Sequence, residues 1–421
     1  MPSAPESTVT ESLDGPENAT AAPIDARNAA SADASGDIRN NAGTSIGTVH
    51  SDAGTSIGSA HSDVGASIGS ARRVRVSKTK PQTRRRHETL PWFVYLVLLV
   101  VLLATALLCI CVGSVSLPLD QTVSTIWAAC TGQPTSSPII TDVRVPRVLC
   151  VALVGAALSI CGAAMQGLLK NPLADGSTLG VSSGASLGAV LSIAFGITIP
   201  GVPLAGTTTM AIAFAFLSLL IILGLAYRID FSLSTYTIIL IGVIFSMFVS
   251  AILSLIITFA PDKVKSITFW TMGSLSGSDY IDVALVAVAL LVFGTIILRY
   301  ARELNAFAIG EENARTIGVD VKRTKLVILI CISVLIGVCV SVSGTIGFVG
   351  LVIPHMVRMV VGPNHKRLLP ATLFSGAIFL MLADLLARTM FSPMELPIGV
   401  VTSLIGSVVF IYIFYRTKQV R

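Results

Sequence analysis

Long apolar runs recur from Trp92 to the end of the chain and are separated by short polar segments. Most of these runs hold about 18 or more residues, which is enough for an α-helix to cross a hydrocarbon layer roughly 30 Å thick. Hydrophobic residues make up 53% of the chain and charged residues only 12%, a balance that excludes an ordinary soluble protein. The short alternating segments of a membrane β-barrel are not seen. The sequence therefore predicts an all-α polytopic membrane protein in the cell (plasma or inner) membrane.

The apolar runs predict about ten membrane-spanning helices. Their expected bounds are 92–114, 147–169, 178–198, 204–226, 233–259, 280–298, 326–343, 347–361, 369–388 and 396–415. The eighth is expected to be a broken or half-length helix, because Ser343–Pro354 holds three glycines and a proline. Loops on one side of this arrangement carry most of the lysines and arginines, so the positive-inside rule places that side, with both termini, in the cytoplasm.

Residues 1–90 form a segment of different composition, rich in Ser, Ala, Thr, Gly and Asp. An 11-residue unit recurs there as AGTSIGTVHSD, AGTSIGSAHSD and VGASIGSARRV. One isoleucine per unit cannot bury a core, so we expect a disordered cytoplasmic tail ahead of a permease domain at 91–421. The tail ends in a basic run, residues 72–86. A basic run can bind nucleic acid, but beside a membrane span we interpret it as a topology signal and expect no nucleic-acid partner.

Residue types that hold metals or catalyse reactions are sparse. The seven cysteines form no CxxC pair, and six lie in apolar runs, where cysteine acts as a small hydrophobe. Acidic and histidine residues are nearly absent from the predicted spans, whereas a path for bare metal ions or protons usually needs them. No GxxxxGK[ST] phosphate loop is present. We therefore expect no cofactor, no resident metal, no ATPase activity of the chain's own and a large, shielded cargo.

Eight motifs resemble one family, in the family's order, from about Arg144 to the C-terminus. They read RVPRVL, GAALSICGAAMQGLLKNPLAD, GVSSGASLGAV, WTMGSLSG, AIGEENARTIGV, SGTIGFVGLVIPHMVRMVVGPNHKRLLP, ADLLAR and ELPIGVVTSLIG. The family is that of the FecCD-type permeases of ABC importers for iron-siderophores, haem and vitamin B12. The resemblance implies uptake of an iron chelate by alternating access. A siderophore is favoured as the cargo over haem or vitamin B12. The resemblance also implies two ATPase subunits, a substrate-binding protein and a second permease copy or paralogue as partners within the lipid bilayer.

Two alternatives belong to other classes of protein. An ion-coupled secondary transporter would need carboxylates on a path inside the membrane. Asp384 and Glu395 lie near a span end and fit that requirement poorly. A non-transporting membrane sensor would use the repeat tail as its output arm.

Three arginines are candidates for docking a substrate-binding protein. Arg144 and Arg147 precede the second predicted span on its expected outer side, and Arg388 ends the ninth. The resemblance implies that they receive acidic residues of the binding protein, for which bidentate guanidinium groups are suited. An interfacial position is the alternative for Arg144 and Arg147. For Arg388, a private salt bridge with Asp384 four residues earlier is equally supported.

The stretch 299–325 is the longest polar segment within the predicted permease domain. Its part Ala308–Gly318 resembles the family's coupling segment, in which two short helices pivot at a glycine and press into a cleft of the ATPase. The resemblance implies small contact positions at Gly310, Ala314 and Gly318, with Glu311, Glu312 and Arg315 on the exposed side. A bulky residue at Ala314 is then expected to uncouple hydrolysis from uptake. A solvated amphipathic connector is the alternative.

A set of small and helix-ending residues is assigned to helix packing or to the translocation path. Asn171 and Pro172 are expected to end a helix, because proline lacks an N–H and disfavours helical geometry before it. Gly180, Gly184 and Gly188 recur at every fourth position, which lets a neighbouring backbone approach closely. Either tight packing alone or a border of the path explains them. The remaining members of the set are Gly155, Gly162, Ser183, Gly344, Gly347 and Pro354.

Overall fold

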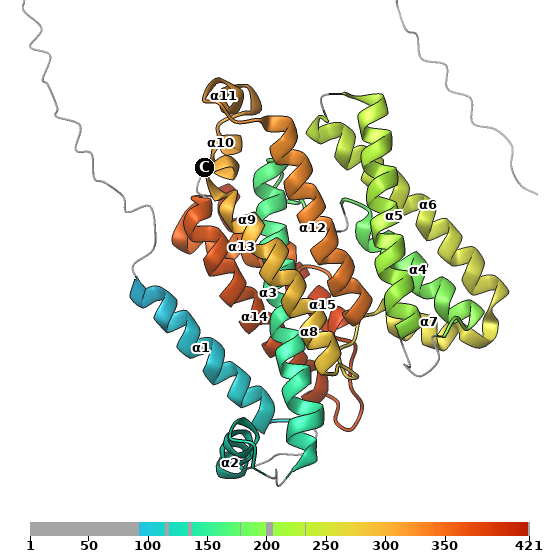
Figure 1. Ribbon diagram of the computed structural model, residues 1–421, viewed down its shortest axis with the longest axis vertical. Coiled ribbons are helices and arrows are strands. Elements are labelled where there is room, and N and C mark those ends of the chain that lie inside the picture. Colours follow the sequence, from blue (N-terminus) through green and yellow to red (C-terminus); the bar gives the residue numbers. More distant parts are fainter. Residues whose placement is uncertain are drawn as a thin grey trace, which may run out of the picture. The chain divides into compact units, whose positions relative to one another are not determined.

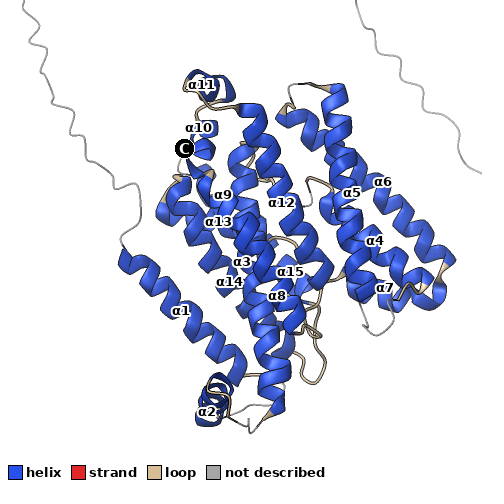
Figure 2. Ribbon diagram, viewed as in Figure 1, coloured by secondary structure: helices blue, strands red, loops and turns tan. Residues whose placement is uncertain are grey.

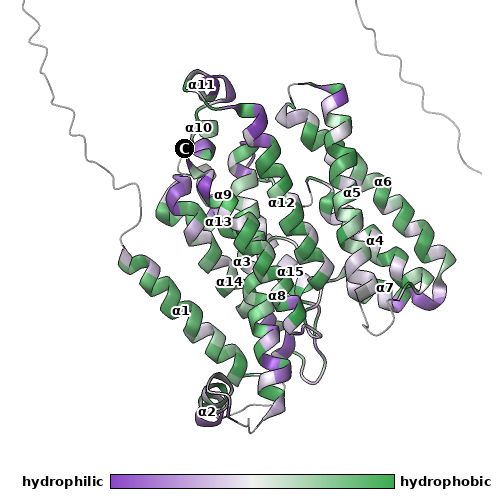
Figure 3. Ribbon diagram, viewed as in Figure 1, coloured by the Kyte–Doolittle hydropathy of each residue, from purple (hydrophilic) through white to green (hydrophobic). Residues whose placement is uncertain are grey.

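The computed structural model describes residues 92–113, 118–133, 137–176, 178–198, 205–231 and 233–419. The N-terminal tail, its repeats and its basic run lie outside the described residues. Every regular element in the described ranges is a helix (Figure 2). Seven of these helices are long and apolar enough to cross a membrane, and apolar residues run along them (Figure 3). The prediction of an all-α polytopic membrane protein is confirmed.

The helices follow the predicted spans to within a few residues (Figure 1). The long apolar helices are α1 (Trp92–Cys111), α3 (Val145–Leu168), α5 (Ala205–Ile229), α6 (Thr235–Phe259), α8 (Tyr280–Ala289) continued by α9 (Thr295–Arg299), α12 (Val321–Ser343) and α14 (His365–Thr389). Single π-helical turns, Ile139–Arg144 and Leu290–Gly294, extend α3 and join α8 to α9. The other three predicted spans correspond to the short apolar helices α4 (Val181–Phe195) and α13 (Val349–Val361) and to α15 (Ile398–Gln419), whose apolar part is Ile398–Ile413.

Four short helices lie between the spans. They are α2 (Leu119–Cys130), α7 (Val264–Thr271), α10 (Ala301–Ala308) and α11 (Glu311–Thr316). A 3-10 turn, Pro261–Lys263, precedes α7. The first two were not predicted, and at 1.5 Å per residue they are too short to cross a bilayer. The last two, separated by Gly310, match the pair of short helices implied by the family resemblance.

Helices α3 and α12 occupy the centre of the bundle. Their most apolar windows are 78% and 72% buried, against 17% for α1. Around this pair, α3 packs against α13 and α14, while α12 packs against α4 and α5. Helix α1 contacts mainly α14 and leaves most of its surface uncovered, as expected for a helix that faces lipid.

Glycines stand where these helices touch. A Cβ atom on Gly155 would overlap the carbonyl oxygen of Gly376 in α14, and one on Gly162 would overlap that of Gly350 in α13. Such contacts bring helix backbones closer than any side chain allows. Helix α3 ends at Leu168, just before Asn171 and Pro172, and the Asn171 Oδ1 atom accepts a hydrogen bond from the Leu173 N–H at 2.9 Å.

The connection between α12 and α13 lies among the helices as a non-helical segment, Gly344–Phe348. Gly344 has φ +66°, a conformation that favours glycine, and Pro354 lies inside the short helix α13. The Thr345 hydroxyl donates to the Thr271 carbonyl at the end of α7. The prediction of a broken eighth span is therefore confirmed, and the Ser343 hydroxyl satisfies part of its backbone by donating to the Gly344 carbonyl at 3.0 Å.

Candidate functional site

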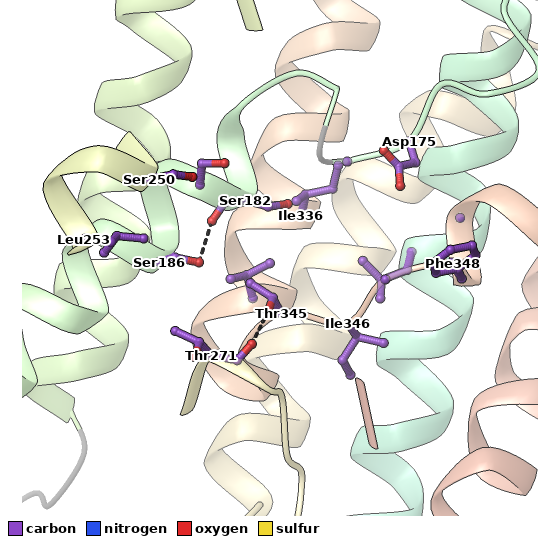
Figure 4. Close-up of a pocket in the computed structure, with 16 residues that line it drawn as sticks. Asp175, Ser182, Ser186, Ser250, Leu253, Thr271, Ile336, Thr345, Ile346 and Phe348 are labelled. Carbon is purple, nitrogen blue, oxygen red and sulfur yellow. Dashed lines mark hydrogen bonds between the residues drawn. The ribbon is translucent and has the colours of Figure 1, made fainter. Parts of the chain in front are cut away.

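A cavity of about 300 Å³ lies between α4, α6, α12 and the Gly344–Phe348 segment. Its polar lining consists of Asp175, Ser182, Ser183, Ser186, Ser250, Thr271 and Thr345. Figure 4 shows Ser182 and Ser186 on one side of this space and Phe348 on the other. Three of these hydroxyls come from α4 and the other three from segments far apart in the sequence, so the fold brings them together.

The two faces of α4 explain the placement of the serines. Gly184 and Gly188 face α5, where added Cβ atoms would overlap Ser218 and the Met210 carbonyl oxygen. Ser182 and Ser186 therefore fall on the other side of the helix, toward the cavity, and the Ser186 hydroxyl donates to the Ser182 carbonyl at 2.9 Å. Ser183 also lines the cavity. Close packing and the cavity lining thus use separate faces of one helix.

Gly180 corrects the predicted three-glycine face. It precedes α4 as its N-terminal cap with φ +72°, outside the helix, and it lies against Gly242 of α6. A left-handed backbone at this position favours glycine, since other residues are strained there. Gly180 therefore turns the chain into α4 and does not extend the Gly184 and Gly188 face.

The lining chemistry suits hydrogen bonding to a polar solute. Hydroxyls donate and accept, and Asp175 adds one carboxylate. No lysine or arginine lies among the described residues that line the cavity. Within the described ranges, no group of three His, Cys, Asp or Glu side chains could hold a metal ion. The described lining thus offers hydrogen-bonding groups, but no cationic side chain that would pair with an anionic solute.

A second, more open cavity of about 660 Å³ adjoins the first. Four lining residues are common to the two cavities: Thr271, Thr345, Gly347 and Phe348. The rest of the second lining comes largely from α15, including Gly399 and Ser403. The Gly344–Phe348 segment therefore forms the partition between the two spaces, and Gly347 borders both.

The three predicted docking arginines converge in a buried cluster. The Arg147 guanidinium lies 2.8 Å from Asp384 and 3.0 Å from Glu395, and Arg388 lies 3.5 Å from Asp384. Arg144 donates to the Ile110 carbonyl at the end of α1 at 2.6 Å, and Arg388 donates to that of Cys109. These bonds satisfy carbonyl groups that a helix terminus leaves unpaired.

Burial changes the expectation for this arginine cluster. Arg144, Arg147 and Arg388 are only 6%, 8% and 4% exposed, so their charged groups face inward. The private Asp384–Arg388 pair that was the alternative for Arg388 is present. Docking through Arg147 or Arg388 would require each to leave its internal carboxylate.

The predicted coupling segment, Ala308–Gly318, and the helix α10 before it lie at the end of the bundle opposite α2 (Figure 1). Gly310, with φ +125°, joins α10 to α11, and Gly318 follows α11 with φ +90°. Two details correct the predicted contact face. Ala314 is fully buried inside the chain, and Glu311 is held in an ion pair with Lys325. Arg315 and Glu312 are exposed as predicted.

Two isoleucines take the place of Ala314 as the apolar surface of the coupling segment. Ile309 is 60% and Ile317 is 62% exposed, one after each short helix. Sequence reasoning missed both, as well as the pairing of Lys325, which follows Lys322 and Arg323 at the end of the polar stretch 299–325 and carries no distinguishing signal there. It also missed Asn305, whose Oδ1 atom accepts from the His365 N–H at 2.8 Å and ties α10 to α14.

We expect the Ile317→Ser variant to weaken attachment of an ATPase subunit, because it removes exposed apolar surface without disturbing the fold. Retention of the ATPase in a pull-down should fall about fivefold or more, near 1 kcal/mol at 25 °C. The matched control is Ile281→Ser, at an isoleucine 70% exposed at the start of α8. Equal retention by both variants would contradict a contact at Ile317.

The architecture defines a helical membrane protein with a polar, solute-sized cavity inside its bundle. The profile of the FecCD transport family matches residues 99–416, so the chain belongs to the FecCD transport family. The family resemblance of the motifs is confirmed.

Individual relatives agree with this assignment. An uncharacterized ABC transporter permease protein of Bacillus subtilis is 42% identical over 349 residues, which cover 81% of this chain and 98% of that protein. A cobalamin import system permease protein of Halobacterium salinarum is 40% identical over 287 residues, which cover 68% of this chain and 76% of that protein. A solved structure described as an inward-facing metal-chelate type ABC transporter has a TM-score of 0.69 at 33% identity, covering 77% of this chain and 100% of that chain.

Proposed function

We propose that this chain is the permease subunit of an ABC importer that takes up a metal chelate, foremost an iron chelate such as a siderophore. The observation that carries the proposal is the hydroxyl-lined cavity beside the Gly344–Phe348 partition. Hydroxyl groups suit a chelate whose metal is already shielded, since they hydrogen-bond the organic shell and do not compete for the ion. The relatives for cobalamin and for a metal chelate support the same class of cargo.

Energy would come from a separate pair of ATPase subunits. The exposed Ile309 and Ile317 of the coupling segment support this arrangement, because they offer apolar surface at the end of the bundle. The opposite end would receive a substrate-binding protein, and both termini would face the cytoplasm. A second copy or a paralogue of the permease would complete the path. ATP binding and hydrolysis would shift the population between inward- and outward-facing states through differential affinity.

The cavity is tested by a substitution at Ser183, on α4. A leucine there fills part of the space, so we expect the Ser183→Leu variant to lower uptake of a radiolabelled ferric siderophore at least tenfold, or about 1.4 kcal/mol. Uptake is measured in proteoliposomes that hold the full complex. The control is Ser254→Leu on α6, where the exposed serine lines no described cavity and its hydroxyl donates only to the Ser250 carbonyl.

Two outcomes would count against the proposal. Full uptake by the Ser183→Leu variant would mean that the cargo does not pass through the cavity. Uptake by the permease alone, driven by an ion gradient without an ATPase, would instead favour the secondary transporter alternative.

A further inference from the structure

Lys325 is a fully buried lysine on the central helix α12, with 0% of its surface exposed. Its ammonium lies 2.8 Å from the Glu311 carboxylate at the start of α11, and it donates to the Leu233 carbonyl at 2.9 Å. The Thr235 hydroxyl, at the start of α6, donates to the same carboxylate at 3.4 Å. One ammonium therefore joins three segments: the coupling segment, the α5–α6 connection and α12.

The chemistry of the junction makes it a rigid joint. A buried lysine is tolerated only when its charge is paired and its protons are hydrogen-bonded, and both partners here are on other segments. The Glu311 side chain is itself partly exposed, 30%, at the surface where the coupling segment ends. A shift of α11 that kept this pair intact would have to carry α12 and the start of α6 with it.

Both of these helices form walls of the polar cavity. Ile336 and Val340 of α12 line it, as do Ser250 and Leu253 of α6. Lys325 and Ile336 are eleven residues apart, about three helical turns and roughly 16 Å, so they lie on the same face of α12. The joint at one end of α12 and the cavity wall are thus parts of a single stiff element.

We propose that the Lys325–Glu311 pair is the positioning contact that transmits movement of the coupling segment to the cavity walls. This inference rests on the proposed function, because it assigns the ATPase as the source of the movement. Lys325 and Glu311 touch no cargo in this role. They set the positions of the cavity-lining parts of α12 and α6 when the coupling segment shifts.

The test uses the reconstituted complex with the Lys325→Met, Glu311→Gln and combined variants. We expect cargo taken up per ATP hydrolysed to fall at least tenfold in each single variant, with no further fall in the combined variant, while the ATPase subunits still co-purify. The control is Lys322→Met, the same substitution on the same helix, where the ammonium lies 3.9 Å from the centre of the Phe231 ring and so contacts the α5–α6 connection without pairing with Glu311.

A labelling readout separates transmission from a merely structural role. A cysteine placed by Ser250→Cys, in the cavity lining, is modified with a water-soluble maleimide with and without ATP. The rate should change at least threefold with ATP in the otherwise unaltered complex and should not change when Glu311→Gln is added. Glu311 is partly exposed, so this variant is suited to the test even where Lys325→Met does not fold.

The results distinguish failure of the transmitting role from failure of the proposed function. An ATP-dependent labelling change that survives both single variants, or normal uptake per ATP in them, would overturn the transmitting role and leave the proposed function standing. Absence of ATP-dependent uptake in the unaltered complex would instead overturn the proposed function itself.

Discussion

The Asp384→Asn variant is expected to be less stable than the unaltered chain by about 3–5 kcal/mol. Asp384 is 1% exposed and faces both Arg147 and Arg388. Asparagine has nearly the same shape, so the change removes the negative charge without making a cavity. Two buried guanidinium groups then lose a shared counter-charge, and Glu395 compensates only Arg147. The apparent Tm of the detergent-solubilised protein measures the effect.

A second acidic residue supplies the control for this charge removal. Asp262, in the turn before α7, is exposed, and Asp262→Asn should leave the apparent Tm within about 1 °C, because surface substitutions of this kind have small effects. Equal Tm values for the two variants would mean that the arginine cluster does not stabilise the fold. In that case the arginines could leave their internal carboxylates to dock a binding protein without lowering the stability of the fold.

The Gly162→Ala variant is expected to lose about 1–3 kcal/mol of stability or more, since overpacking of a filled interface forces backbones apart. The added methyl group would overlap the carbonyl oxygen of Gly350. A backbone atom cannot rotate away as a side chain does, so α3 and α13 would have to separate. Retention of the monodisperse peak in size-exclusion chromatography after heating measures the loss.

Gly224→Ala is the matched control for the glycine contact. Gly224 lies inside α5, and a Cβ atom there would meet nothing within 4 Å. Alanine is a better helix former than glycine by about 1 kcal/mol, so this variant should be as stable as the unaltered chain or more stable. Equal behaviour of the two alanine variants would refute the close α3–α13 approach.

The spans could be predicted from the sequence because the membrane imposes one rule on every segment that crosses it. An apolar run of sufficient length must be a helix, since all backbone groups need partners inside the segment. The break before α13 was also predictable, because Gly344, Gly347 and Pro354 each disfavour a continuous helix. Local composition was enough for these features.

Features that depend on contacts between segments were not predictable. The short helices α2 and α7 carry no long apolar run to mark them. Ala314 is buried where α11 packs against α10 and α12, and its small side chain is equally compatible with a surface contact. Gly180 has the spacing of Gly184 and Gly188, yet it precedes the helix. In each case the sequence pattern allowed two placements and tertiary packing selected one.

The partition between the two cavities has an energetic consequence that follows from its lack of regular structure. Residues 344–348 belong to no helix, so no ladder of main-chain bonds must be broken when they move. Joining the spaces would require rotations about a handful of single bonds and the loss of a tether such as that from Thr345 to Thr271. Each such bond is worth about 1 kcal/mol. Opening such a partition would therefore cost little free energy and would not require any of the long helices around it to unfold.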